Sequence, residues 1–177
     1  MKKVVINGCF GGYGLSVNGV IEVLKAKGYD ENSLCIYKEM PYNMEEQLGY
    51  RCGYIKTNKD DDLYLLWGIS TEDYGEMFDK TSSHKLFGES SFERTDAELI
   101  SCIEKFGSEF MSDDCAALYI DEYDEENFDY YIDEYDGSET LCTIPVVSEK
   151  RLREMENVDD IMDYLESIDI TVRRKEN

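Results

Sequence analysis

The side chains in this sequence that are best suited to a chemical or binding role lie in two copies of one hexapeptide. Its sequence is Tyr-Ile-Asp-Glu-Tyr-Asp, at residues 119–124 and 131–136. Each copy sets three carboxylates among two tyrosines. Carboxylates attract basic groups and can take the place of phosphates, while tyrosine rings stack on guanidinium groups. The two copies therefore predict a surface for a basic partner, formed by Asp121, Glu122, Asp124, Asp133, Glu134, Asp136, Tyr119, Tyr123, Tyr131 and Tyr135.

Both copies have the length and composition of β-strands, because tyrosine and isoleucine favour strands. Glu125-Glu126-Asn127 between them is a polar interruption of the kind that reverses a chain, so we expect the two copies to form an antiparallel hairpin. Alternation along a strand puts Asp121 and Asp133 each on the tyrosine face of its copy. Like charges that face each other across a sheet destabilise it. The face is therefore either a solvated, aggregation-blocking surface or a surface that meets a strongly basic molecule.

Composition limits the class of partner. Hydrophobic residues make up 42% of the 177 residues and aromatic residues 12%, which is enough for a packed core, so we expect a single domain over 1–177. Forty acidic and 18 basic residues give a net charge of −22, which disfavours direct nucleic-acid binding and favours basic proteins or cations. No apolar run reaches the roughly 20 residues of a membrane span, and the amino terminus lacks a signal-peptide core. We expect a cytoplasmic protein without a membrane partner, and a homodimer is an open alternative.

Metal and cofactor chemistry finds little support in the sequence. The six cysteines include no Cys-x-x-Cys pair and His84 is the single histidine, so no zinc site is predicted. No segment has the spacing of an EF-hand calcium loop. No catalytic residue, cofactor or metal is predicted. Four cysteines lie in apolar patterns and are expected to be small buried residues: Cys9, Cys35, Cys102 and Cys142.

A glycine-rich loop at residues 8–16 follows an expected strand at 3–7 and precedes an expected helix. Ser16 is a natural N-cap for this helix, and Gly28 is a natural stop. The order strand, loop, helix can cradle phosphate on backbone amides, although the P-loop lysine and the Rossmann glycine pattern are both absent. The loop is therefore either a close-packing turn or the centre of a nucleotide-binding protein or enzyme, with Cys9 as its nucleophile.

The remaining pattern completes an α+β expectation. Further strands are expected at 34–40, 54–57, 63–67 and 140–147, and a loosely patterned insertion spans about 41–94. Thr95 begins a capping box for a helix that ends at Gly107, and a last helix spans about 148–168. We predict a mixed or antiparallel sheet that joins the amino-terminal strand–loop–helix–strand unit to the tyrosine hairpin, with at least three helices packed on it.

Two segments resemble a known family. The opening Val-Val-Ile-Asn-Gly-Cys-Phe-Gly-Gly-Tyr-Gly-Leu-Ser, at 4–16, is similar to the start of a widespread group of small phage and prophage proteins. That group has a strand, an Asn-x-Cys-Phe-Gly-Gly-Phe-x-Leu-Ser loop and a helix. The second segment runs from Arg94 through the following helix and Leu118–Ile120 to Tyr131–Glu139, where the group has an Ile-x-Glu-Tyr-Asp-Gly-x-Glu motif. The group ends soon after this motif, whereas this chain adds a strand and a helix.

The resemblance implies a phage or mobile-element origin and no particular reaction. Joined to the acidic charge, it suggests an anti-defence protein that is similar to anti-CRISPR proteins, many of which are small, acidic and without enzymatic activity. Such a protein would mimic DNA at the basic site of a nuclease such as Cas9, which reads its PAM with arginines and holds the heteroduplex in a positive channel. The nucleotide-binding or enzymatic alternative, centred on residues 8–16, stays open.

Overall fold

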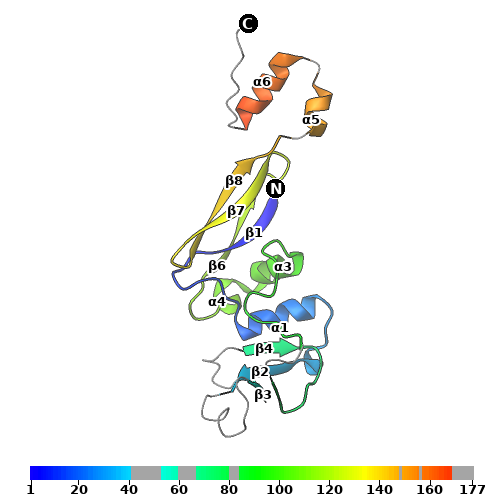
Figure 1. The fold of residues 1–177 in the computed structure, drawn as a ribbon, viewed down its shortest axis with the longest axis vertical. Helices are drawn as coiled ribbons and strands as arrows, with labels where there is room; N and C mark the ends of the chain where they lie inside the picture. Colours follow the sequence, from blue (N-terminus) through cyan, green and yellow to red (C-terminus); the bar gives the residue numbers. More distant parts are fainter. Residues whose placement is uncertain (41–52, 60–66, 80–83, 148, 156, 169–177) are drawn as a thin grey trace.

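The computed structural model describes residues 1–40, 53–59, 67–79, 84–147, 149–155 and 157–168 (Figure 1). Helices and antiparallel strands both occur, which confirms the predicted α+β class with at least three helices. The strands are β1 (Lys2–Asn7), β2 (Cys35–Glu39), β3 (Gly53–Thr57), β4 (Trp67–Ser70), β5 (Met77–Asp79), β6 (Leu118–Tyr123), β7 (Phe128–Tyr135) and β8 (Ser138–Pro145). The helices are α1 (Val17–Ala26), the short 3-10 turn η1 (Glu31–Ser33), α3 (Ala97–Phe106), α4 (Ser108–Met111), α5 (Glu149–Glu154) and α6 (Val158–Ser167).

The elements are stacked along the long axis of the molecule (Figure 1). An antiparallel sheet in the order β4-β2-β3-β5 lies at one end, followed by the helices α1, α3 and α4, the pair β1-β6, the hairpin β7-β8, and finally α5 and α6. One hydrophobic core lies between the four-stranded sheet, the helices α1, α3 and α4, and the pair β1-β6. Ile36 and Ile69 of the sheet are buried in it with Leu24 of α1, and Val5 of β1 and Leu118 of β6 close it from the other side.

A second, smaller core lies between the pair β1-β6 and the hairpin. Val5 faces the helices, so its neighbours in β1 must point to the opposite side, because successive side chains on a strand alternate. The two cores therefore bury β1 on both faces. The buried residues of the smaller core are Val4, Ile6 and Tyr123, packed against Phe128, Tyr130, Ile132 and Leu141 of the hairpin.

The expected strands at 3–7, 34–40 and 54–57 and the helix after Ser16 are confirmed. The order strand, loop, helix, strand is therefore right, but the expectation that this unit shares one sheet with the tyrosine hairpin is wrong. β1 pairs with β6, whereas β2 pairs with β3 and β4. The reason is that α1 packs between β1 and the β2 sheet, and its buried side chains belong to a core that both sheets line.

The stretch 41–94, predicted as an insertion, contributes strands to the same sheet as β2. Its described residues form β3, β4 and β5, and β3 lies between β2 and β5. Of the strand expected at 63–67, residues 63–66 lie outside the described residues, and β4 begins at Trp67. His84 is exposed, and its ring stacks on Tyr74 with the ring centroids 3.9 Å apart.

The two hexapeptide copies do not pair with each other, so the predicted hairpin is wrong. The first copy lies in β6 and pairs with β1, whereas the second lies in β7 and pairs with β8 across the turn Asp136-Gly137. The φ angles of these two turn residues are 51° and 85°. Two successive positive φ values make the type I′ turn that matches hairpin twist, and Asp-Gly is among its preferred sequences. This turn decides the pairing, and Glu125-Glu126-Asn127 only connects β6 to β7.

Two expected helix boundaries also need correction. α3 begins after Asp96 rather than Thr95, because the Asp96 carboxylate accepts the amides of Glu98 (3.1 Å) and Leu99 (3.0 Å). The region 148–168 holds two helices instead of one, because Asn157 caps the start of α6. None of the described helices is long and apolar enough to cross a membrane.

Candidate functional site

The tyrosines of the first hexapeptide copy are largely built into the fold. Tyr123 is only 6% exposed, and its ring centroid lies 5.1 Å from that of Tyr130 in the smaller core. It points inward because pairing with β1 turns the tyrosine side of β6 towards the hairpin. Tyr119, on the same side, is 40% exposed and packs over Gly8. Tyr123 is therefore not available to a partner, although it was among the predicted site residues.

The carboxylates of the first copy have partners within the protein. Asp121 accepts the amide of Glu122 at 2.8 Å, and the Glu122 carboxylate lies 4.0 Å from Lys3 Nζ. Asp124 closes the turn before β7 by accepting the Glu126 amide at 3.1 Å. These three acidic residues make contacts within β6, β1 and the turn before β7, and β6 lies in a different sheet from the second copy.

The second copy presents its side chains to solvent. Tyr135 is 80% exposed and Tyr131 is 48% exposed, and they alternate with exposed acidic residues on the side of β7 that points away from β1. Residues directly opposite on β8 share this side. We call the surface the outer hairpin face; it consists of Asp129, Tyr131, Asp133 and Tyr135 of β7 with Ser138, Thr140, Cys142 and Ile144 of β8.

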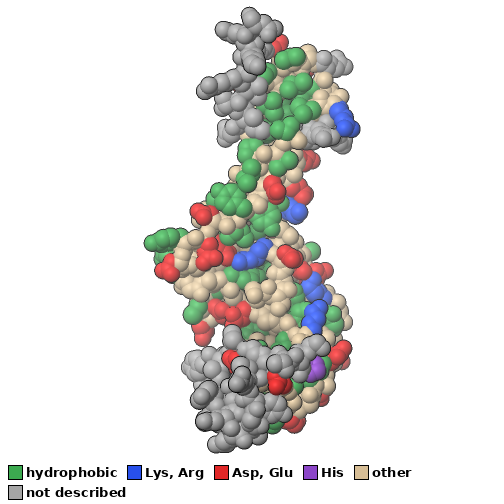
Figure 2. All heavy atoms as spheres, viewed as in Figure 1, with side chains coloured by type: hydrophobic (Ala, Val, Ile, Leu, Met, Phe, Trp, Pro, Cys, Tyr) green, Lys and Arg blue, Asp and Glu red, His purple; other side chains and the backbone are tan. Residues whose placement is uncertain are grey.

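Negative charge gathers around this face. From Phe106 to Glu149 the sequence contains 14 of the 40 acidic residues and none of the 18 basic ones. Asp133, Glu134 and Asp136 are exposed, and no described cation lies within 4.0 Å of their carboxylates. In Figure 2, acidic and hydrophobic side chains lie side by side at the level of the hairpin. Elsewhere several lysines do form ion pairs with carboxylates, namely Lys2, Lys3, Lys25, Lys27 and Lys56.

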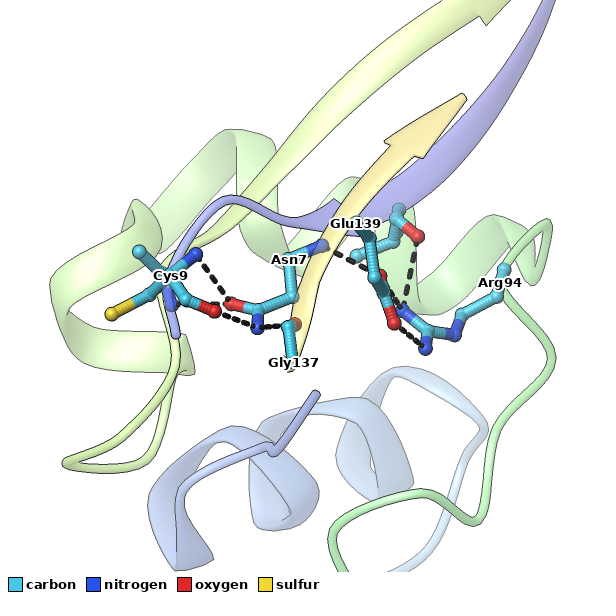
Figure 3. Close-up of polar contacts among 7 residues, drawn as sticks. Asn7, Cys9, Arg94, Gly137 and Glu139 are labelled. Atoms are coloured by element: carbon cyan, nitrogen blue, oxygen red, sulfur yellow. Dashed lines mark hydrogen bonds and ion pairs between the residues drawn. The ribbon is translucent and has the colours of Figure 1, made fainter. Parts of the chain in front are cut away.

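A part-buried ion pair between Arg94 and Glu139 anchors the turn end of the hairpin (Figure 3). Glu139, near the start of β8, is 6% exposed, and its carboxylate accepts two hydrogen bonds from the Arg94 guanidinium, at 2.6 and 2.9 Å. The same carboxylate accepts a hydrogen bond from the backbone amide of Asn7 at 2.8 Å. The Arg94 guanidinium also donates to the Val5 carbonyl at 3.3 Å. The buried charge is thus matched by a cation and hydrogen bonds, as its desolvation requires. These contacts join β8, β1 and the segment before α3 at one point.

The Asn7 side chain connects the glycine-rich loop to the hairpin turn (Figure 3). Asn7 is fully buried, and its Nδ2 donates to the carbonyls of Gly137 at 2.7 Å and Cys9 at 2.8 Å. Its Oδ1 accepts the amides of Ala117 at 2.8 Å and Cys9 at 3.3 Å. Both donor hydrogens and both acceptor positions of the amide are therefore used, which fixes the loop against the turn.

Glycine is required where the loop and the turn meet. A Cβ on Gly137 would lie 2.3 Å from the backbone nitrogen of Gly12, and a Cβ on Gly11 would lie 2.5 Å from the carbonyl oxygen of Cys115. The amides of Leu15 and Ser16 donate to carbonyls of other segments. The side of the loop that faces the turn has no room for a phosphate. The structure thus favours the close-packing interpretation of the loop.

Tyr13 of the loop packs on this cluster of Arg94, Glu139 and Asn7, which we call the anchor. The Arg94 guanidinium carbon lies 3.3 Å from the centroid of the Tyr13 ring, which is a cation–π contact. The Tyr13 hydroxyl is buried and meets no hydrogen-bond partner among the described residues. Burial raises the pKa of Tyr13 to about 12, while the nearby Arg94 charge acts in the opposite direction. The phenol is therefore neutral at physiological pH.

The cysteines and the loop aromatic differ from expectation. Of the four cysteines expected to be buried, only Cys102 is; Cys9, Cys35 and Cys142 are half-buried. Cys9 Sγ lies 3.5 Å from the carbonyl oxygen of its neighbour Phe10. The Phe10 side chain is 66% exposed, and sequence reasoning did not single it out. The loop therefore adds an exposed aromatic residue close to the hairpin turn.

Sequence reasoning also missed the pair Arg94 and Glu139. They lie 45 residues apart, and no local pattern connects two charges at that distance. Asn7, Arg94, Gly137 and Glu139 nevertheless all lie within the two segments, 4–16 and 94–139, on which the expected resemblance rests. The structure brings both segments together at the anchor.

Comparison of the chain with protein-family models, with curated proteins and with solved structures finds no match. The part of the chain that the structure describes contains no group of three or more His, Cys, Asp or Glu side chains placed to hold a metal ion. Two features of the molecule bear on function: the exposed outer hairpin face and the anchor that fixes its turn end.

Proposed function

We propose that this chain is an acidic, phage-type anti-defence protein that acts in the manner of an anti-CRISPR protein. It binds the basic nucleic-acid site of a host nuclease such as Cas9 in the bacterial cytoplasm, and blocks DNA recognition or cleavage without catalysis. The observation that carries the proposal is the outer hairpin face with the adjoining turn, where acidic and aromatic side chains are exposed and no described cation lies beside Asp133 of the face or Asp136 of the turn. The phage origin is supported by the resemblance of the two segments at the anchor.

The charge distribution supports a basic partner. A net charge of −22 steers a positively charged surface towards the molecule and repels nucleic acid. Complementary charge chiefly raises the association rate and excludes wrong partners. Asp129, Asp133 and Asp136 would take the places of phosphates in a groove that normally holds DNA, such as the positive channel of Cas9.

The tyrosines add aromatic rings on which a guanidinium group can stack. Tyr131 and Tyr135 are exposed and alternate with the carboxylates, so a guanidinium group can contact a ring and a carboxylate together. Tyrosine and arginine are enriched among the residues that dominate binding energy at interfaces. The face therefore combines carboxylates and aromatic rings, two side-chain types that recognise arginine.

The anchor supports the same function by holding the face in place. The turn end of the hairpin is fixed by Glu139, Arg94 and Asn7, which are part-buried or buried and hydrogen-bonded. A surface that is ordered before binding loses less conformational entropy when the complex forms. The alternative, a nucleotide-binding protein or enzyme centred on residues 8–16, has no comparable observation in its favour, because the loop packs against Gly137.

The test compares two variants that each lose four exposed carboxylates. Asn and Gln keep the shape of the side chains, and Asn also suits the positive φ of the Asp136 position. The face variant carries Asp129→Asn and Asp133→Asn on the outer hairpin face, Asp136→Asn in its turn, and Glu134→Gln on the other side of β7. The matched control carries changes at exposed carboxylates outside the hairpin: Glu72→Gln, Glu76→Gln, Glu93→Gln and Glu109→Gln.

The measurement is DNA binding and cleavage by guide-loaded Cas9, with each protein titrated at low and high salt. The face variant should inhibit at least about tenfold more weakly than the wild type, whereas the control should stay close to it. Inhibition by the wild type should also weaken as salt rises, and more steeply than inhibition by the face variant. Equal inhibition by the face variant and the wild type would remove the acidic mechanism. No effect of the wild type on Cas9 would overturn the choice of target.

A further inference from the structure

Among the described residues, one edge of β7 has no strand beside it. β7 pairs with β8 along its other edge, and in the described part of the chain these two strands form a sheet of their own. Unpaired strand edges carry rows of backbone donors and acceptors, and most proteins cover or interrupt them. Alternate backbone amides of β7 point to this open side.

The hairpin turn settles the direction of each amide. In a two-residue type I′ hairpin the residues that flank the turn, here Tyr135 and Ser138, are hydrogen-bonded to each other. Because hydrogen-bonded and non-hydrogen-bonded pairs alternate, Asp133 points its amide inward, whereas Ile132 and Glu134 point theirs outward.

Two observed hydrogen bonds agree with this alternation. The Val146 amide donates to the Asn127 carbonyl at 2.7 Å, which continues the inward set. The Tyr130 amide donates to Asp129 Oδ1 at 2.8 Å, so it points outward and is capped by a neighbouring carboxylate. The amides of Ile132 and Glu134, which follow it along the open edge, have no acceptor among the described residues.

Several outward amides of the neighbouring strands β1 and β6 have acceptors within the protein. On the outer edge of β1, the Val5 amide donates to the Arg94 carbonyl at 2.8 Å. On the outer edge of β6, the Leu118 amide donates to Ser112 Oγ at 2.9 Å. β1 lies beside the turn end of β8, where the Asn7 backbone amide donates to the Glu139 carboxylate at 2.8 Å. The stretch of β7 from Ile132 to Glu134 is therefore an open edge that borders the outer hairpin face.

We propose that this edge accepts an extended basic segment of the target protein, which adds to the hairpin as a third strand. The proposal rests on the function proposed above and specifies how the partner is held. Backbone hydrogen bonds to Ile132 and Glu134 supply affinity, and alternate side chains supply specificity. Basic side chains on one side of the added strand reach Asp133, and apolar ones on the other side meet Ile132. A second copy of this chain fits less well, because residues 128–145 contain five acidic residues and no basic one.

The experiment uses the full-length protein and two synthetic peptides of about eight residues. One peptide alternates lysine and valine, so it can form a strand, and the other alternates lysine and proline, which has the same charge but cannot pair. The readout is amide hydrogen exchange at Ile132 and Glu134, with the inward Asp133 amide as the internal reference. The lysine–valine peptide should slow exchange at both outward amides by at least about tenfold, and the lysine–proline peptide should not.

Substitutions at one position separate the backbone from the charge. Glu134→Pro removes the outward amide and leaves the ladder to β8 intact, whereas Glu134→Gln removes only the charge. The lysine–valine peptide should bind the proline variant about tenfold more weakly than the glutamine variant. If the proline variant does not fold, the exchange experiment on the wild type still decides.

The outcomes distinguish the two proposals. Equal binding of both peptides without protection of Ile132 and Glu134 would overturn strand addition and leave charge-driven docking standing. Protection by the lysine–valine peptide together with no inhibition of Cas9 would support strand addition at the edge of β7 and overturn the choice of nuclease. Protection that grows with protein concentration in the absence of peptide would assign the edge to a second copy and overturn this inference.

Discussion

The two copies of Tyr-Ile-Asp-Glu-Tyr-Asp contain the same six residues and have opposite environments. The fifth residue is 6% exposed in the first copy, as Tyr123, and 80% exposed in the second, as Tyr135. The fourth residue lies 4.0 Å from Lys3 Nζ as Glu122, whereas Glu134 has no described cation beside it. The strand partner causes the difference, because β1 brings a lysine and apolar side chains and β8 brings no basic residue. Identical local sequences can thus stabilise the fold in one place and stay available for binding in another.

Breaking the anchor of the second copy should have the largest effect. Arg94→Ala leaves the Glu139 carboxylate buried without its cation, and should lower the free energy of unfolding in urea by about 3–5 kcal/mol. Arg94→Met combined with Glu139→Gln leaves no buried charge and keeps an acceptor for the Asn7 amide. This double variant should recover much of the loss.

The exposed ion pair Lys2–Glu125 is the matched control for the anchor. Lys2→Ala removes a pair whose side chains are both more than 40% exposed, and should cost less than about 1 kcal/mol. Equal losses for Arg94→Ala and Lys2→Ala would show that the anchor contributes no more than a surface contact.

Alanine at the fifth position of each copy tests the comparison itself. Tyr123→Ala empties a space in the smaller core and should cost about 3–5 kcal/mol of unfolding free energy. Tyr135→Ala should change it by no more than about 0.5 kcal/mol, because the side chain is exposed. Urea unfolding of both variants is the measurement. Similar losses at the two positions would mean that the two copies are not differently packed.

Tyr13→Phe should change the unfolding free energy at neutral pH by less than the variants above. The variant removes a buried hydroxyl without a described partner and keeps a ring against Arg94, so it should raise the unfolding free energy by about 1 kcal/mol.

The pH dependence of this variant has a defined sign. The pKa of Tyr13 is raised from 10.0 to about 12 in the folded protein, so the stability that depends on its neutral form is complete below pH 10. It is lost as pH rises to about 12, by roughly 2–3 kcal/mol in total. The advantage of Tyr13→Phe over the wild type should therefore grow between these two pH values. A constant difference in urea midpoints from neutral to alkaline pH would contradict the assigned pKa.

The parts of the fold that could be predicted depend on local signals. The β-branched run at 3–7, the Ser16 cap and the stop at Gly107 each act within a few residues, and β1, α1 and the end of α3 follow from them. Strand pairing is different, since Val4 and Asp121 are far apart in sequence and no local pattern selects the partner. The pairing of β7 with β8 is local and is signalled by Asp136-Gly137, whereas the repeat of the hexapeptide favours a pairing of the two copies that does not occur.

The candidate site could be predicted in part for the same reason. Alternation along the second copy correctly places Tyr131, Asp133 and Tyr135 on one face, because it needs only the strand. Burial of Tyr123 depends on β1, and the contact of Arg94 with Glu139 depends on three segments, so neither can be read from the hexapeptide.

The central claim is that the second copy, and not the first, meets the basic partner. The third residue of each copy gives the most direct test, because Asp121→Asn and Asp133→Asn remove one carboxylate each from identical hexapeptides. The measurement is the concentration of each variant that halves DNA binding by guide-loaded Cas9. Asp133→Asn should require about two- to fivefold more protein than the wild type, as expected for one exposed ion pair, and Asp121→Asn should match the wild type. Equal weakening by both variants, or weakening by Asp121→Asn alone, would contradict the claim.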